Sequence, residues 1–150
     1  DECGGLVSYS TKTKDGVDSG MSFTMDRYKN DQVLQLTNQE SVSNGKIVSL
    51  RGIVINEYPA DSHLGKTIKA KNEAKKITDP EEREKRIKEI NKQHGGAHLL
   101  FLGKTKDSGQ GLFLNDTNGK PKIYIYVDKK GNPKIQAFDS KGEKKDLITE

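Results

Sequence analysis

The sequence DTNGKPKI at residues 116–123 recurs as DKKGNPKI at residues 128–135, and a degraded copy, DSKG, begins at Asp139. In each copy the aspartate side chain can bond to its own backbone, and the glycine three residues later accepts positive φ, so each copy predicts a tight turn. The isoleucine that ends each full copy opens an alternating apolar pattern, which is typical of a strand. The repeat therefore predicts a run of tight β-hairpins, and it indicates no particular chemistry.

The apolar residues around the repeat keep one phase over three strands. They are Leu112 and Leu114, then Ile123, Ile125 and Val127, then Ile135 and Ala137. Tyr124 and Tyr126 fall on the opposite face because side chains alternate along a strand. The pattern predicts a mainly β protein built on an antiparallel β-meander. Whether the meander forms an open barrel, a sandwich or a propeller-like sheet stays open at this point.

The first 60 residues also read as strands. Met21, Phe23 and Met25 alternate with polar neighbours, which indicates a half-buried strand over 20–28, preceded by a shorter strand over 5–9. Asn44-Gly45 is a strong hairpin signal and is expected to join a strand over 32–38 to one over 46–56.

Residues 62–94 break this pattern with many Lys and Glu residues, and we expect a charged helical insertion there. Residues 78–82, TDPEE, supply a capping residue, a proline in the first turn and acids near the positive end of the helix dipole. Gly95 and Gly96 are expected to end this helix, and a weaker helix is expected over 64–76. Ile87 and Ile90 alone make a narrow apolar stripe, so the insertion is expected to lie loosely on the sheet or to pack on a second copy.

The composition limits the size of the core and the kinds of partner that we expect. The 150 residues fit one β-rich domain, and an apolar content of 31% against 32% charged residues predicts a thin core on one face of a sheet. The net charge of +4 is mild, and Glu residues are interspersed with the lysines of 66–92, so we expect no nucleic acid as partner. Cys3 is the single cysteine and rules out an intrachain disulfide. No stretch has the ~20 apolar residues that span a bilayer.

Asp26, Tyr28 and Asp31 form the first candidate site. With Gln32 they make a polar cluster in a strand-turn-strand segment, and carboxylates there could hold a small ligand or a metal ion at a sheet edge. The competing interpretation is turn chemistry, in which Asn30 and Asp31 shape the bend.

Tyr124 and Tyr126, with Phe138, form the second candidate site, an aromatic strip on one sheet face. Such a strip could stack sugars or bases. The competing interpretation is a second core face covered by the helical insertion. His94 and His98 are four residues apart, but the two glycines between them break the helix that a zinc pair would need, so we expect no metal site and no cofactor.

Four segments together resemble a known family. They are ECGGL at residues 2–6, FTMDRY at 23–28, NDQV at 30–33 and the two full turn-strand copies. The chain resembles a family of uncharacterised bacterial proteins with an N-terminal membrane anchor, an ECGGL-like segment, a charged helical insertion and a closing β-meander. The resemblance implies that residues 1–150 are part of a longer protein, with an anchor and one or two strands upstream. It implies a bacterial cell-envelope location, with membrane contact only through that anchor, and it implies no reaction.

These observations lead to two functional hypotheses. The first is a non-catalytic binding or assembly module of the bacterial cell envelope, held to a second copy or to an envelope protein through sheet edges or the helical insertion. The second is a hydrolase that uses carboxylates near Asp26 and Asp31, since paired carboxylates can carry general acid–base chemistry.

Overall fold

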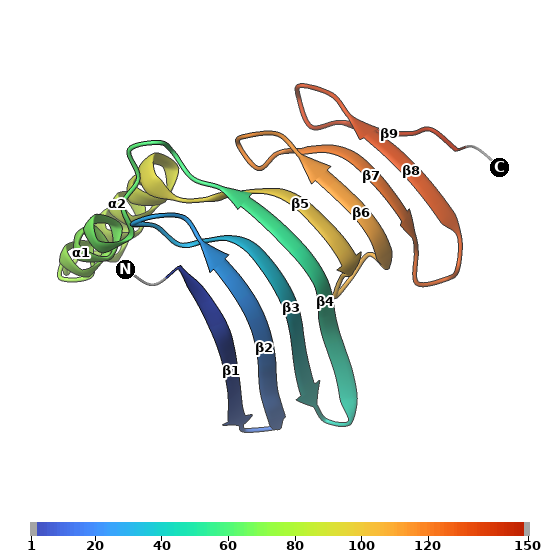
Figure 1. Ribbon diagram of the computed structural model, residues 1–150, viewed down its shortest axis with the longest axis horizontal. Coiled ribbons are helices and arrows are strands. Elements are labelled where there is room, and N and C mark those ends of the chain that lie inside the picture. The colour runs from blue at the N-terminus through green and yellow to red at the C-terminus, as the bar shows by residue number, and fades with distance from the viewer. Residues whose placement is uncertain (1–2, 149–150) are drawn as a thin grey trace.

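The computed structural model describes residues 3–148, so Glu2 of the ECGGL segment lies outside the described residues. Residues 3–148 contain nine strands and two helices, which follow one another in the order that Figure 1 shows. They are β1 (Gly4–Thr13), β2 (Gly16–Asp26), β3 (Gln32–Ser43), β4 (Lys46–Glu57), α1 (Leu64–Ala74), α2 (Pro80–His94), β5 (Ala97–Lys104), β6 (Gln110–Asn115), β7 (Pro121–Val127), β8 (Pro133–Phe138) and β9 (Lys144–Asp146).

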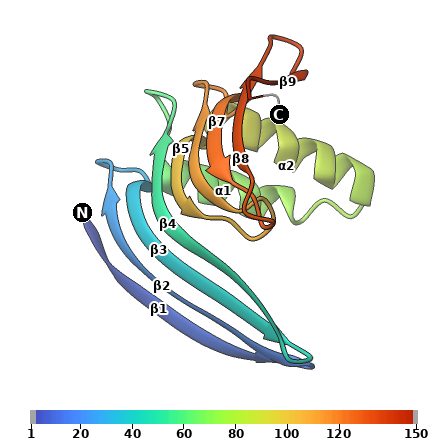
Figure 2. The ribbon, with the colours of Figure 1, turned by 90° about the vertical axis from the view of Figure 1, so that its right-hand side faces the viewer.

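The strands form one sheet in the order of the sequence. Each strand pairs antiparallel with the next, from β1 to β9, and the sheet does not close on itself. The predicted antiparallel meander is confirmed, and it takes the form of an open sheet. The long strands β1–β4 bend along their length, and β1 and β9 lie at opposite edges (Figures 1 and 2).

The register brings one apolar side chain from each of the first eight strands into a single transverse row. The row is Leu6, Phe23, Leu36, Ile53, Leu102, Leu112, Ile125 and Ile135. A second row beside it, starting from Met25, contains Leu34, Ile55, Leu100, Leu114, Ile123 and Ala137. Both rows lie on one side of the sheet because directly opposed residues share a face. We call this side the apolar face.

The three aspartate turns adopt the same geometry. Oδ1 of Asp116 accepts hydrogen bonds from the backbone N–H groups two and four residues later, and Asp128 and Asp139 repeat both bonds. The glycine of each turn has positive φ, between 75° and 90°. The degraded copy at Asp139 is thus a complete turn, and it leads into β9.

The hairpins of the N-terminal half are longer than the sequence pattern indicated. Asn44 and Gly45 both have positive φ, 48° and 74°, as a two-residue type I′ turn requires, and they join β3 to β4 as predicted. The strand expected over 5–9 instead extends from Gly4 to Thr13. Residues 8–13 are Ser, Thr, Lys and Tyr without apolar alternation, so pairing with β2 decides their conformation and local pattern does not.

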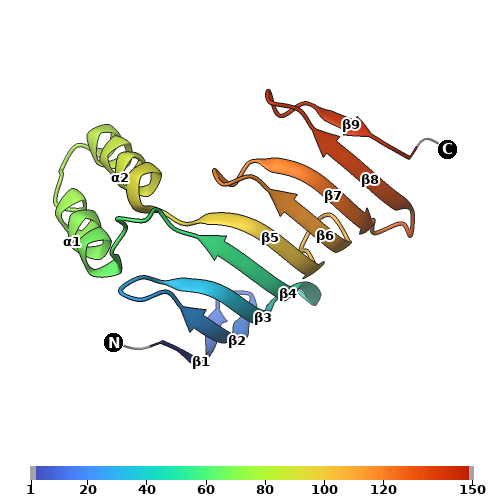
Figure 3. The same cartoon turned by 45° about the horizontal axis from the view of Figure 1, so that its top comes forward.

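The helical insertion lies beyond the ends of β2–β5 (Figures 1 and 3). α2 begins as predicted, because Oδ1 of Asp79 accepts from the Glu82 N–H at 2.8 Å and Pro80 is the first helical residue. The two helices pack against each other, and Ala74 and Ile90 are buried. The narrow apolar stripe therefore suffices, since each helix mainly needs to cover its neighbour and does not cover a sheet face.

The accessible surface is unusually large for the chain. It measures 10686 Å², whereas a compact monomer of 16.7 kDa exposes about 7,600 Å². Among the described residues the buried apolar side chains are Ala74, Ile90 and Phe113. The expectation that one sheet face forms a buried core is wrong for the apolar face, because no second layer of structure from residues 3–148 covers it.

The first prediction concerns Gly111, where β6 and β7 approach each other closely. A Cβ at this position would overlap the Ile125 carbonyl oxygen and would lie 2.5 Å from the Tyr126 Cα. Because backbone atoms must shift to make room, Gly111→Ala should destabilise the protein by about 2 kcal/mol, as measured by urea unfolding. Gly65→Ala in α1 is the control. Its Cβ would meet the His63 ring at 3.5 Å, and it should leave stability unchanged or raise it by up to about 1 kcal/mol. Equal effects of the two substitutions would contradict the close approach at Gly111.

The aspartate turns make stability depend on pH. Hydrogen bonds from the Lys120 and Asn118 N–H groups and the charge of Lys122 lower the pKa of Asp116, and bonds from the Asn132 and Lys130 N–H groups do the same at Asp128. The ionised form is favoured in the folded state, so this contribution is present above pH 3.8, the ordinary value for Asp, and it is lost as pH falls through the lower folded-state value.

The paired substitution Asp116→Asn and Asp128→Asn should therefore cost stability near neutral pH, and the cost should disappear as pH falls below 3.8. Urea unfolding of both proteins from pH 7 to pH 2.5 measures it. A cost that is constant over this range would show that the charge of the aspartates is irrelevant to the turns.

Candidate functional site

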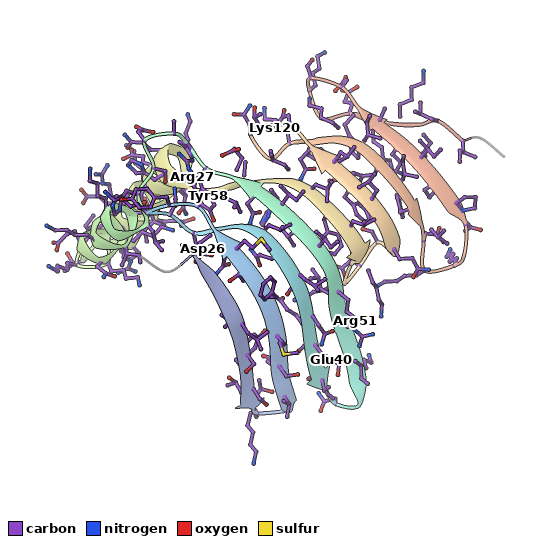
Figure 4. The ribbon with its side chains drawn as sticks, in the orientation of Figure 1. Asp26, Arg27, Glu40, Arg51, Tyr58 and Lys120 are labelled. Carbon is purple, nitrogen blue, oxygen red and sulfur yellow. The ribbon has the colours of Figure 1, made fainter. Side chains whose placement is uncertain are left out.

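The turn between β2 and β3 holds the helical insertion. The Arg27 guanidinium donates to three consecutive carbonyl oxygens after β4, those of Tyr58 (2.8 Å), Pro59 (3.2 Å) and Ala60 (3.0 Å). It also lies 3.7 Å from a Glu57 carboxylate oxygen. Figure 4 shows Asp26, Arg27 and Tyr58 together where the sheet meets the helices.

Two further bonds from the same turn reach the start of α1. The first helical N–H, of Leu64, donates to the Lys29 carbonyl oxygen at 3.0 Å, and Asn30 Nδ2 donates to the Ser62 carbonyl oxygen at 3.2 Å. Ser62 Oγ in turn donates to the His94 carbonyl oxygen at the end of α2. We call residues 27–31 and 58–64 the insertion clamp, because their bonds connect the sheet to both helices.

Asp26 and Asp31 come close to one phenol. Burial raises the pKa of Tyr58, and the negative charges of Asp31 and then Asp26 raise it further. Asp31 Oδ1 accepts from the Gln32 N–H at 2.9 Å, and Asn30 Oδ1 accepts from the Asp31 N–H at 3.0 Å, as the turn interpretation expects. The hydrolase hypothesis for these carboxylates stays a prediction.

Tyr28 is the most exposed member of the first candidate site. Its side chain is 72% exposed, and the Lys29 ammonium lies 5.0 Å from its ring centre. A ligand held jointly by Tyr28 and the two aspartates remains a prediction. The charges of the two aspartates also act on Tyr58, which no local sequence pattern indicated.

Tyr124 and Tyr126 lie in a group of five aromatic rings on the side of the sheet opposite the apolar face. Phe113 stands at the centre, with ring centroids 6.0 Å from Phe101, 4.9 Å from Tyr124 and 5.6 Å from Tyr126. Phe138 lies 4.8 Å from Tyr124. Phe113 is 7% exposed and the tyrosines are half-buried, and burial raises the pKa of Tyr124.

The helices do not pack over these rings, since they pack on each other beyond the ends of β2–β5. The aromatic strip is thus neither fully exposed nor covered by the insertion, and the rings bury one another. Leu50, Val54, Phe101, Phe113 and Tyr124 line a hollow of about 360 Å³ beside them.

A ladder of polar side chains borders this hollow. Asn56 Nδ2 donates to the Gln32 carbonyl oxygen, and Asn56 Oδ1 lies within hydrogen-bond distance of His98 Nδ1. Asn115 Nδ2 donates to the His98 carbonyl oxygen, and the Tyr124 hydroxyl donates to Asn115 Oδ1 at 3.4 Å. The ladder connects β3 to β7, so these groups hold the strand ends together.

A cleft of about 690 Å³ was not indicated by the sequence. It lies between the segment after β4, the end of α2 and the β6–β7 turn, and its charged lining residues are Glu57, Lys92 and Lys120. Tyr58 and Lys120 mark its two sides in Figure 4. Because the lining comes from segments far apart in the chain, no local pattern could have grouped these residues.

Comparison with protein-family models, with curated proteins and with solved structures finds no match to this chain. Within residues 3–148, no three His, Cys, Asp or Glu side chains are grouped so that they could hold a metal ion. Neither helix found among these residues has the length and apolar character needed to cross a membrane.

The insertion clamp makes a prediction about stability. Because Arg27 satisfies three carbonyl groups with a charged donor, Arg27→Ala should lower the free energy of unfolding by about 2 kcal/mol and should speed amide exchange in α1. Arg51→Ala is the matched control. Arg51 also bonds two side chains, Asn38 and Glu40, but on an exposed part of the sheet, so its loss should cost under about 1 kcal/mol. An Arg27 effect no larger than the Arg51 effect would contradict the clamp.

Proposed function

We propose that this protein is a non-catalytic binding or assembly module of the bacterial cell envelope, and that it binds a partner protein through its apolar face. The observation that supports the proposal is the exposure of that face. Leu6 is 69% exposed and Leu36 is 60% exposed, and Phe23, Ile53, Leu102 and Ile125 of the same row are also exposed.

The size of the surface favours a protein partner over a small ligand. At ~4.8 Å per strand and ~3.4 Å per residue, two rows across β1–β8 cover about 34 Å by about 14 Å, or roughly 500 Å². The largest apolar patch of an ordinary monomer measures about 300–600 Å² and is often functional. A standard protein interface buries about 800 Å² on each partner, and two rows with their polar borders approach that size.

The composition of the surface supports the same conclusion. The hollow at the N-terminal end of the apolar face is lined by Leu6, Met21, Phe23 and Leu36, with Asn38 and Arg51 at its border. Arg51 bonds Glu40 at 2.8 Å on this side of the sheet, which Figure 4 shows at the lower part of β3 and β4. An apolar centre with a polar border is the usual anatomy of a protein interface. The envelope location rests on the family resemblance alone.

Site-specific photo-crosslinking in bacterial cells tests the proposal. A photoreactive residue in place of Leu36 should give one discrete adduct, identified by mass spectrometry as an envelope protein. The same residue in place of Gln39, on the opposite face of β3, is the matched control and should give little. Leu36→Lys should prevent the adduct formed from a second photoreactive position at Leu102, in the same row. Equal labelling from positions 36 and 39, or no adduct from position 36, would contradict the proposal.

A further inference from the structure

Three glycines form a row without side chains across β4, β5 and β6. Gly52 pairs with Gly103, and Gly103 pairs with Gly111. The row lies on the face that carries the aromatic rings, because side chains alternate along each strand. Larger side chains that flank the glycines line the hollow of about 360 Å³, and they are Leu50, Val54, Phe101, Thr105 and Phe113. The glycine row therefore leaves the room that the hollow occupies.

The lining of the hollow is uncharged. Its polar members are His98, Thr105, Ser108, Asn115 and the phenol of Tyr124. None of the described residues that line it is Lys, Arg, Asp or Glu. An ion would lose its hydration there without gaining a counter-charge, which costs much free energy. The lining therefore favours a neutral ligand.

Hydrogen bonds at the border of the hollow determine which polar atoms can receive a ligand. Because Asn56 Nδ2 donates to the Gln32 carbonyl oxygen, Asn56 Oδ1 is the acceptor in its bond with His98, and His98 Nδ1 carries the proton. In the neutral ring the other nitrogen, Nε2, is then an acceptor, and no group among residues 3–148 bonds to it. The Tyr124 hydroxyl donates to Asn115 Oδ1, so its oxygen can also accept. The border thus offers acceptors to a donor on the ligand.

Few polar groups are left over for a ligand with many hydroxyls. Thr105 Oγ1 donates to the Gly109 carbonyl oxygen and accepts from the N–H groups of Ser108 and Gly109, so it is fully used. A sugar in the hollow would bury several hydroxyls without partners, which is unfavourable. An aromatic ring needs no such partners. It can extend the edge-to-face packing of Tyr124 on Phe113, whose ring planes meet at 72°.

We propose that this hollow binds a small neutral aromatic molecule with one hydrogen-bond donor, such as a hydroxyl or a ring N–H. The ring of the ligand packs against Phe101 and Tyr124, and its donor bonds to His98 Nε2. A volume of about 360 Å³ suits a ligand of this size. The inference goes beyond the proposed function, because the hollow and the apolar face lie on opposite sides of the sheet and the ligand is not a protein.

Titration of the whole chain with indole, followed by NMR, tests the proposal. Indole should shift the signals of the Val54 methyl groups and should give nuclear Overhauser effects to Val54 and Tyr124. Benzofuran has the shape of indole, but an oxygen replaces the N–H. It should bind about fivefold more weakly, because it has no donor for His98 Nε2.

Two phenylalanine substitutions on β4 locate the site. Val54→Phe fills part of the hollow and should weaken indole binding at least about tenfold, because the new ring and the ligand compete for the same space. Val48→Phe is the matched control. It places the same side chain on the same face of the same strand but outside the lining of the hollow, so the affinity for indole should stay unchanged.

Four results would overturn the proposal. They are no binding of indole, nuclear Overhauser effects to Leu36 on the apolar face in place of Val54, benzofuran binding as tightly as indole, and methyl glucoside occupying the hollow where indole does not. Should Val54→Phe fail to fold, the comparison of indole with benzofuran in the unsubstituted chain remains decisive. Crosslinking from position 36 tests the proposed function separately, since it probes the other face.

Discussion

The register in which consecutive strands pair is the constraint on which the rest of the structure depends. Every ladder joins neighbours in the sequence, and three turns of identical hydrogen bonding fix the register at the C-terminal end. Because side chains alternate along a strand, a slip of one residue would move the apolar residues of that strand to the other face. The apolar face and the aromatic group opposite it both follow from this register.

A register of this kind produces a single layer, and most domains need two layers to bury their apolar surface. The helical insertion does not supply the second layer, because the insertion clamp holds it beyond the ends of the strands and its two helices pack on each other. The opposite side of the sheet partly compensates through its packed rings around Phe113. Nothing in the part of the chain that the structure describes covers the apolar face in this way, which accounts for the large accessible surface and for the proposed binding role.

Local chemistry determined what the sequence could predict. The aspartate turns, the Asn44-Gly45 hairpin, the Asp79 cap and the phase of β6–β8 each depend on residues within a few positions of one another, and the structure confirms them. The length of β1 depends on its pairing with β2. The location of the insertion depends on the bonds from Arg27 to the carbonyl groups of residues 58–60, which are distant in the sequence. The alternation of Met21, Phe23 and Met25 correctly predicted that these side chains share one face of the sheet. Alternation alone does not show whether other structure covers that face.

The candidate site residues divide in the same way. Tyr124 and Tyr126 share a face, as their spacing required, whereas their mutual burial through Phe113 depends on pairing across three strands. Asp31 belongs to the insertion clamp and Asp26 directly precedes it, and the phenol whose pKa both charges raise, that of Tyr58, follows β4 in the sequence. Residue spacing could indicate which side chains share a face, but it could not indicate which of them the insertion would approach.

Small-angle X-ray scattering tests the central claim, an open single-layer sheet, most directly. A compact domain of 150 residues has a radius of gyration of about 15 Å. At concentrations where forward scattering reports one chain, the open sheet predicts a value clearly above this, together with a folded profile. A radius of about 15 Å would show that the sheet closes or is covered by the rest of the chain, and it would contradict the account.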